Sequence, residues 1–162
     1  MVKIAIVNEK DEIIRYKDRG TLNDDDIYRV SALWLTNPKG EVLIARRSYN
    51  KKNDPGKWGT AVAGTVDEGE DYYENIVKET EEEIGLTGLD FEKGPYGRNA
   101  KGKQFFYQWY IAHTDKDIED MKIDEEEVEE VRWITKEQLI KEIEKNPEEF
   151  ISSMDEWRDM FM

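Results

Sequence analysis

The sequence predicts an α/β protein in which a mixed β-sheet carries helices on its faces. Three observations predict this fold class: many short apolar runs of strand length, a few stretches with apolar residues at helical spacing, and turn signals between them. The chain has 162 residues, which suits one domain with a buried core. No internal repeat, low-complexity tract or linker divides it, so we expect a single domain over residues 1–162.

The first half of the chain alternates short apolar runs with turns. The polar turns NEKD and NPKG each separate two apolar runs, which predicts two hairpins, the first over about residues 1–20. We expect a loop at residues 50–57 and the turn DEGE after the stretch WGTAVAGTV. The runs that predict strands are residues 2–7, 12–16, 28–36, 41–48 and 58–66.

A helix is predicted from about Asp71 to Ile84, and Gly85 is expected to end it as a C-terminal cap. At 100° per residue, one stripe of this helix is suited to dock on the sheet. The stripe consists of Tyr73, Ile76, Val77, Thr80 and Ile84.

The second half of the chain predicts further strands, in LDFEKGPYG, KQFFYQWYIAHT and VEEVRWIT, and then helices over about residues 135–161. Thr135 is expected to cap the first of these helices. Asn146 is expected to cap the last one, with Pro147 at its first position. The helical spacing of the apolar residues in the last helix indicates packing in the core. These residues are Phe150, Met154, Trp157 and Phe161.

The composition excludes several classes of function. The chain has 38 acidic against 24 basic residues, a net charge of −14, which argues against a nucleic-acid polymer as the main partner. Cysteine is absent, which excludes disulfides, thiolate metal sites and cysteine nucleophiles and is typical of a reducing cytosol. No stretch has the length and apolarity of a signal peptide core or a membrane span. We therefore expect a cytoplasmic protein without a membrane partner.

The run KETEEEIG, which begins at Lys78, concentrates carboxylates within the predicted helix. In an acidic chain such a run can be a solvated surface, and Glu81 is expected to point to water. Glu79, Glu82 and Glu83 instead fall on the flank of the buried stripe. Partial burial of three like charges costs several kcal/mol unless a cation lies among them. One lysine does not balance them, so the pattern indicates a cation site.

The spacing around this run is more specific than its charge. Five residues separate Gly64 from Glu70, and seven separate Glu70 from Lys78. The pattern resembles the signature of the Nudix hydrolases, G-x5-E-x7-R-E-U-x-E-E-x-G-U, where U is a bulky apolar residue. Two positions depart from it, because Lys78 replaces the arginine and Thr80 the apolar residue. The matching residues of the motif 64–86 are Gly64, Glu70, Glu79, Glu82, Glu83, Gly85 and Leu86.

The resemblance covers most of the chain. The segments DDDIYRVSALWLTNPKGEVLIARRS, DPGKWGTAVAGTVDEGE and VEEVRWITKEQL are similar to the branch of Nudix proteins related to isopentenyl-diphosphate isomerase. The family fold is an α/β/α sandwich around a mixed sheet, which agrees with the predicted order of elements. We therefore expect a Nudix-type α/β/α sandwich.

The resemblance also implies a function. A Nudix hydrolase cleaves a diphosphate linkage, in a nucleoside diphosphate derivative or a related organic diphosphate, by attack of water at phosphorus. The implied cofactor is Mg²⁺ or Mn²⁺, for which carboxylate oxygens are suitable ligands. By the same resemblance Glu79, Glu82 and Glu83 would hold the metal, with the carbonyl of Gly64 as a further ligand. The expected partner is a small-molecule diphosphate.

Three other motif positions have implied supporting roles. Glu70 is expected to brace the loop against the helix, and Gly85 to end the helix. The arginine that stands at position 78 in the family fixes a catalytic glutamate. Lys78 supplies the charge without the planar two-pronged donor, so the orientation of Glu79 is less fixed, and whether this lysine makes the enzyme slower stays open.

Candidates outside the motif have competing interpretations. Glu127, and after it Glu126, could act as base or metal ligand, but their charge run DEEEVEE is also typical of a solvated segment. Arg46 and Arg47 alternate across a strand, so at most one reaches the site, and the resemblance favours Arg47 as a phosphate contact. Both could equally be solvated. Core packing is expected for Trp58 and Trp109, and a surface position for His113.

Two other functions compete with hydrolysis as interpretations of the sequence. Isomerase chemistry in the resembling branch uses a cysteine and a metal-binding histidine, and this chain has Val62 and Thr65 at those positions, which excludes it. A non-catalytic or weakly active module that binds nucleotides or diphosphates stays open, because Lys78 and Thr80 depart from the motif. A homodimer built from aromatic residues of the first hairpin or the last helix is also possible.

Overall fold

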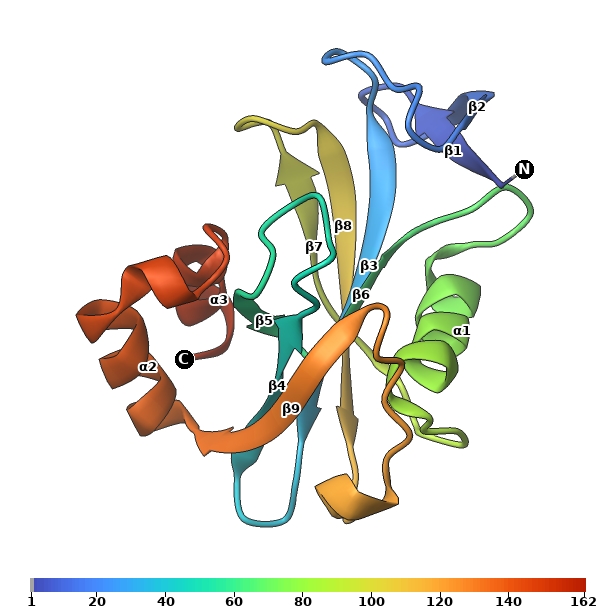
Figure 1. Cartoon of the computed structure of the whole chain (residues 1–162). Helices are drawn as coiled ribbons and strands as arrows, with labels where there is room; N and C mark the ends of the chain where they lie inside the picture. Colours follow the sequence, from blue (N-terminus) through green and yellow to red (C-terminus); the bar gives the residue numbers. More distant parts are fainter. Residues whose placement is uncertain (1) are drawn as a thin grey trace.

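A computed structural model describes residues 2–162, so Met1 of the predicted hairpin lies outside the described residues. A mixed sheet lies between helix α1 on one side and helices α2 and α3 on the other (Figure 1). The predicted α/β fold with helices on both faces is therefore confirmed. The strands and helices are β1 Lys3–Val7, β2 Ile13–Asp18, β3 Tyr28–Thr36, β4 Glu41–Arg47, β5 Trp58–Thr60, β6 Val62–Thr65, α1 Tyr72–Ile84, β7 Glu92–Asn99, β8 Phe105–His113, β9 Val128–Thr135, α2 Lys136–Lys145 and α3 Met154–Phe161, with short 3-10 turns at Ile118–Asp120 and Pro147–Glu149.

Strand β3 organises the sheet. It pairs in parallel with β8 along its whole length, and β8 pairs with β7. On its other edge, β3 pairs with β4 only at its end, through Thr36 and Val42. Residues Val30 to Leu33, earlier in β3, pair with β6 on this edge. Strand β4 turns away and pairs with β5 and β9 instead. This divergence explains why the predicted strand 58–66 is two short strands, one for each partner.

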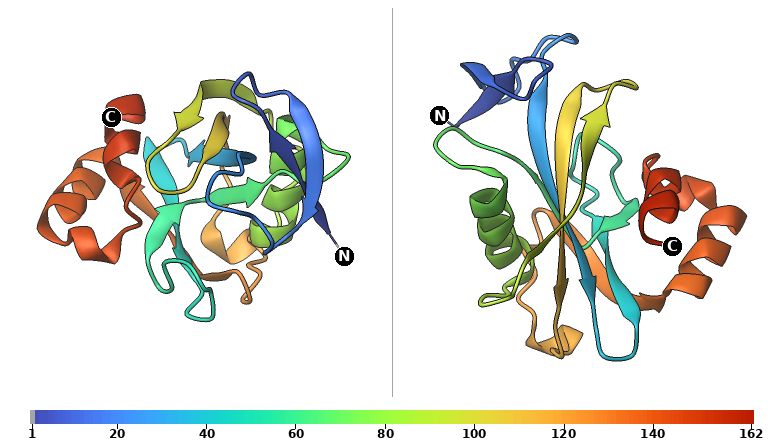
Figure 2. Two further views of the ribbon diagram at one scale, coloured as in Figure 1. Left: turned by 90° about the horizontal axis from the view of Figure 1, so that it is seen from above. Right: turned by 180° about the vertical axis from the view of Figure 1, so that it is seen from behind.

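The N-terminal hairpin forms a separate two-stranded sheet of β1 and β2, as predicted for this segment. Single backbone bridges link Ile4 to Asp67 and Val7 to Ile27. The Lys17 ammonium also pairs with the buried Asp26 carboxylate at 2.5 Å. These contacts fix the hairpin beside β3 and the loop that precedes α1, as the two views of Figure 2 show.

Helix α1 has the predicted boundaries because both ends are capped. The Asp71 carboxylate accepts a hydrogen bond from the backbone N–H of Glu74, and the Glu74 carboxylate accepts one from the N–H of Asp71. This reciprocal capping box satisfies donors of the first turn. Gly85 ends the helix in a left-handed conformation with φ 71°, as expected.

The buried stripe of α1 differs from the prediction. Tyr73 and Val77 are exposed, whereas Asn75 is fully buried. Its side-chain amide donates to the carbonyl of Thr65 and its oxygen accepts from the Ser31 hydroxyl, so hydrogen bonds offset the cost of burying it. These bonds set the rotation of α1 about its axis, so that Asn75 faces the sheet. The buried residues of the helix are Asn75, Ile76, Thr80 and Ile84.

Helix α1 and helices α2 and α3 lie on opposite sides of the sheet (Figure 2). One hydrophobic cluster lies between the sheet and α1, and another between the sheet and α2 and α3. Trp58 and Trp109 are buried in the second layer, as expected for core residues. Trp34 stacks on Phe161 of α3, with ring centroids 4.3 Å apart. The aromatic residues of α3 thus pack inward, and the exposed large apolar residues of the hairpin are Val2, Ile13, Ile14 and Tyr16.

The C-terminal segment starts its last helix later than predicted. Thr135 caps α2 as expected, through the N–H of Gln138. Asn146 makes no side-chain cap, and Pro147 begins only a 3-10 turn. Phe150 is extended and forms a parallel bridge with Trp58, and a turn at residues 152–153 then leads into α3. Among residues 2–162, no helix is long and apolar enough to cross a membrane.

We predict that Gly85→Ala destabilises the protein more than Gly88→Ala. Both glycines have left-handed backbone, where alanine costs about 1 kcal/mol. A Cβ at Gly85 would lie 2.7 Å from the Cβ of Lys122 and 2.9 Å from its backbone N, whereas Gly88 has open space. Overpacking adds about 1–3 kcal/mol at Gly85, measurable by urea denaturation. Equal losses for the two variants would contradict the close packing of Gly85.

Candidate functional site

Glu79 lies against the backbone of β6 because residue 64 is glycine. Gly64 pairs with Ser31 of β3 on the side where β6 replaces β4. A Cβ at Gly64 would come 2.7 Å from Cγ and 2.9 Å from Cδ of Glu79. The Glu79 side chain is 17% exposed. The missing side chain of Gly64 therefore leaves the space that the Glu79 carboxylate occupies.

Glu83 lies one turn further along the same face and is partly buried. Its Oε2 is buried and finds no hydrogen-bond partner in the part of the chain that the structure describes. Burial, and then the negative charges of Glu79 and Glu127, raise the pKa of Glu83 to about 9. An unpaired carboxylate oxygen in such surroundings is an open ligand position for a cation.

The other two glutamates of the run are exposed. Glu81 points to solvent, as predicted. Glu82 was expected at the edge of the buried face and is exposed instead, since the helix is rotated toward Asn75. Burial raises the pKa of Glu79, the Lys78 charge opposes this shift, and the charge of Glu82 adds to it. Glu82 is thus close enough to act on Glu79.

Lys78 occupies the position of the family's arginine and contacts three carboxylates. Its Nζ lies 2.9 Å from Oδ2 of Asp67, 3.0 Å from Oε2 of Glu70 and 3.8 Å from Oε1 of Glu79. Burial disfavours the ammonium, but the hydrogen bonds with Asp67 and Glu70 outweigh it and raise the pKa of Lys78. The lysine therefore keeps its charge and links the loop to the helix.

Glu70 and Asn75 extend this network. Glu70 Oε1 accepts hydrogen bonds from the backbone N–H of Asp67, at 2.8 Å, and from the Asn75 amide, at 2.6 Å. These contacts agree with the bracing role implied for Glu70. Sequence reasoning missed Asn75, although it stands one helical turn before Glu79, on the same face. That spacing is the signal that could have revealed it.

Glu127 approaches the site from the loop before β9. It forms an ion pair with Lys51, and its charge acts on Glu83. The backbone N–H of Asp124, in the same loop, donates to the carbonyl of Glu83 at 3.0 Å. Glu126 is exposed. Of the two carboxylates considered outside the motif, the structure therefore brings Glu127 to the end of α1.

Arg46 and Arg47 have different surroundings, as strand alternation predicts. Arg46 donates to the carbonyl of Gly56, lies over the ring of Trp58 and pairs with Glu130, on the side of α2 and α3. Arg46 is thus directed away from the carboxylates of α1. Arg47 donates to the carbonyl of Asn53 in the loop 50–57. The exposed His113 bonds to Thr36 at the end of β8.

The carboxylates of Glu79, Glu82 and Glu83 have the oxygen ligands that a hard divalent cation prefers, and part of the geometry that such a site needs is present. Within residues 2–162, no three acidic or histidine side chains already converge to a complete metal site. Nevertheless Glu83 has an unpaired oxygen, Glu79 fills the space beside Gly64, and all the donors are oxygens. Glu82 is exposed, and its charge acts on Glu79. The residues present therefore suit Mg²⁺ or Mn²⁺.

Comparison with known proteins decides the family. The family model for the NUDIX domain matches residues 27–154. The chain belongs to the Nudix family. An uncharacterised Nudix hydrolase from Pseudomonas aeruginosa is 29% identical over 146 residues, 89% of this chain and 85% of that relative. Family membership confirms the prediction made from the signature and supports a diphosphate hydrolase as the enzyme class.

Solved structures show the same Nudix fold. The protein DR0079 from Deinococcus radiodurans matches with a TM-score of 0.86 and 24% identity, over 99% of each chain. The NUDIX domain of NrtR from Shewanella oneidensis, in a complex with ADP ribose, matches with a TM-score of 0.59 and 17% identity, over 77% of this chain and 82% of that one. Both likenesses concern the fold.

We predict that Gly64→Ala weakens Mn²⁺ binding by roughly 10-fold, because the new methyl group would displace the Glu79 side chain. Gly59→Ala is the control, since the nearest atom to its methyl group would be Cδ1 of the Ile151 side chain, at 3.3 Å. Isothermal titration with Mn²⁺ measures the affinity, and circular dichroism checks the fold. Equal affinities for the two variants would show that Glu79 does not need this space.

Proposed function

We propose that this Nudix protein is a divalent-metal-dependent hydrolase. It cleaves a diphosphate linkage in a nucleoside diphosphate derivative, or a related organic diphosphate, by attack of water at phosphorus. The observation that carries the proposal is the position of Glu79 and Glu83 on one face of α1, with Glu79 beside Gly64 and a buried Glu83 oxygen that has no hydrogen-bond partner among residues 2–162. Burial and mutual repulsion make such a pair unfavourable without a cation.

The residues that would hold Mg²⁺ or Mn²⁺ are Glu79, Glu82 and Glu83, with the carbonyl of Gly64. When bound, the metal neutralises charge on the phosphoryl oxygens and makes water a better nucleophile. The protein itself positions the carboxylates that would bind the metal. Capping at both ends of α1 and the Gly64 contact keep Glu79 and Glu83 on one face, which limits the reorganisation that catalysis requires.

Two residues outside the motif complete the proposed site. Glu127 is the candidate to accept the proton of the attacking water, because it lies close enough to influence Glu83. Lys51 restrains Glu127 through their ion pair. Arg47 is the candidate phosphate contact, since its guanidinium borders the loop 50–57. The ligand is therefore expected between this loop and the end of α1.

The alternative is a Nudix module that binds its ligand without turnover. Its support was the departure of Lys78 and Thr80 from the motif. Thr80 is fully buried, and its hydroxyl donates to the carbonyl of Ile76, so the substitution leaves the carboxylates undisturbed. Lys78 keeps contacts with both the loop and the helix. Neither departure removes a residue that the proposed hydrolysis requires.

A structural neighbour supports the proposed substrate class. The NrtR domain of the same fold binds ADP ribose, which is a nucleoside diphosphate derivative. Val62, at the position of the isomerase cysteine, is buried in the core under α1, which speaks against isomerase chemistry. A homodimer stays a prediction, for which the exposed Ile13, Ile14 and Tyr16 of β2 offer an apolar surface.

We predict that Glu83→Gln and Glu82→Gln each lower Mg²⁺-stimulated hydrolysis by at least about 100-fold, since several kcal/mol of transition-state stabilisation depend on the metal. Glu81→Gln, an exposed neighbour with the same charge change, is expected to retain full activity. A panel of nucleoside diphosphate derivatives and organic diphosphates, with products identified, is the assay. Full activity in both Glu82 and Glu83 variants would overturn the proposal. Ligand binding by the unmodified protein without turnover in any metal would favour the binding module.

A further inference from the structure

A chain of ion pairs connects the N-terminal hairpin with the catalytic helix. Nη2 of Arg19 lies 3.1 Å from Oδ1 of Asp67. The other oxygen of Asp67 lies 2.9 Å from Nζ of Lys78, which in turn is 3.8 Å from Oε1 of Glu79. Arg19 directly follows β2 and stands before residues 27–154, the part of the chain that matches the family model. Neither Arg19 nor Asp67 belongs to the signature positions.

The backbone fixes the position of this chain of charges. Asp67 bridges to Ile4 of β1, and the N–H of Glu68 donates to the carbonyl of Lys3 at 2.8 Å. The N–H of Arg19 donates to the carbonyl of Val2. Both ends of the Arg19–Asp67 pair are thus attached to the same small sheet. The pair is held in register with the loop that leads into α1.

The distances show which carboxylates hold the lysine. Asp67 and Glu70 lie within hydrogen-bond distance of Nζ, whereas Glu79 lies beyond it. Their side chains are 18% and 13% exposed, so solvent screens these contacts little. Without Asp67 only Glu70 would hold the ammonium on the loop side, so the ammonium would be less restrained from closing on Glu79. A direct Lys78–Glu79 ion pair would compete with a cation for the same carboxylate.

We propose that Asp67 and Arg19 are positioning residues of the metal site. Asp67 retains the Lys78 ammonium on the loop side, Arg19 orients Asp67 and partly balances its charge, and the Glu79 carboxylate stays available to a divalent cation. This inference rests on the proposed function. It assigns part of the site to the hairpin, outside the matched family domain.

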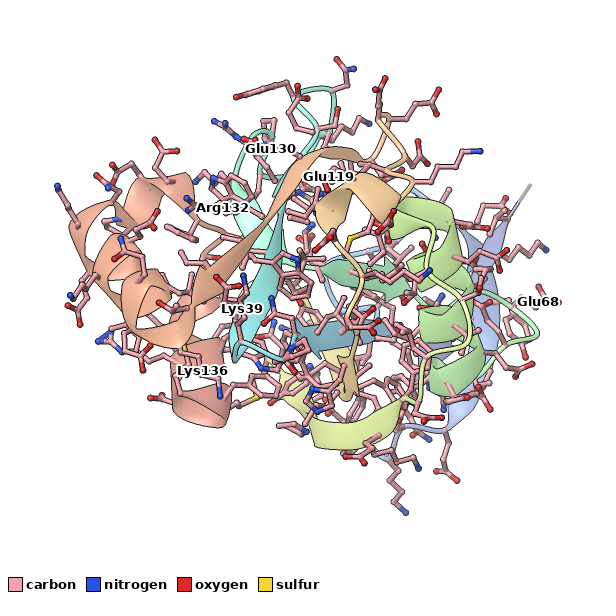
Figure 3. The ribbon with its side chains drawn as sticks, turned by 90° about the horizontal axis from the view of Figure 1, so that it is seen from below. Lys39, Glu68, Glu119, Glu130, Arg132 and Lys136 are labelled. Atoms are coloured by element: carbon pink, nitrogen blue, oxygen red, sulfur yellow. The ribbon has the colours of Figure 1, made fainter. Side chains whose placement is uncertain are left out.

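The simpler alternative is that Asp67 only attaches the hairpin to the loop. In that case its loss lowers stability but leaves metal affinity unchanged. Glu68 provides a matched control, because it is the next residue of the same loop, carries the same charge and points outward (Figure 3). Arg15 is the control on the hairpin, because it is exposed and lies near Asp26 rather than Asp67.

The experiment compares Asp67→Asn, Arg19→Gln and their double variant with Glu68→Gln and Arg15→Gln in the full chain. Mn²⁺ affinity is measured by isothermal titration without substrate, kcat and KM with the best diphosphate substrate, and folding by thermal denaturation. We expect Asp67→Asn to weaken Mn²⁺ binding roughly 10-fold, as supporting residues of metal sites do. We expect Arg19→Gln to weaken it about two- to fivefold. In both, kcat falls and KM stays unchanged, because neither side chain contacts substrate.

The double variant tests whether the two residues act in one chain. If they do, it matches Asp67→Asn alone, because Arg19 acts only through Asp67. Unchanged Mn²⁺ affinity in folded Asp67→Asn, or losses as large in Glu68→Gln, would overturn the inference. If the unmodified protein binds Mn²⁺ but hydrolyses no diphosphate, the proposed function fails, and the affinity comparison still decides the role of Asp67. If the unmodified protein does not bind Mn²⁺, the inference fails as well.

Discussion

The close approach of α1 to the backbone of β6 is the contact on which the rest of the site depends. It exists because β4 leaves β3 after one pair of residues, and β6 takes its place. Gly64 at this point has no side chain to hold the helix away. Asn75, buried one turn before Glu79, fastens the helix to β3 and β6 through Ser31 and Thr65. The sheet topology and the absence of a side chain at residue 64 thus place the carboxylates of Glu79 and Glu83 on the partly buried face of α1 beside β6.

The charges of the carboxylates beside β6 determine where a cation would bind. Partly buried carboxylates that lie close together repel each other, and the protein compensates some of them with hydrogen bonds and ion pairs but not others. Glu70 receives hydrogen bonds from Asn75 and the loop backbone, and Lys78 pairs with it. Glu83 keeps an unpaired oxygen and an elevated pKa. The ionised forms of Glu79 and Glu83 are therefore the least stabilised by the protein itself, and a divalent cation would stabilise them most.

Spacing in the sequence predicted the fold class, the limits of α1 and the family, because these depend on local caps and on residues fixed along one chain segment. It could not predict the rotation of α1. The helical periodicity predicted that Tyr73 and Val77 are buried and Glu82 is partly buried, but the hydrogen bonds of Asn75 to β3 and β6 orient the helix differently. The split of residues 58–66 and the late start of α3 both depend on pairing across the sheet. The link from Arg19 to Lys78 joins three segments and leaves no local signal.

The central claim is that Glu79 and Glu83 form one cation site beside Gly64. The most direct test is a crystal of the protein soaked with Mn²⁺, with an anomalous difference map recorded near the manganese edge. The account predicts a peak about 2.1 Å from carboxylate oxygens of both Glu79 and Glu83. A map with manganese only elsewhere on this acidic surface, or with neither carboxylate in contact with it, would contradict the claim.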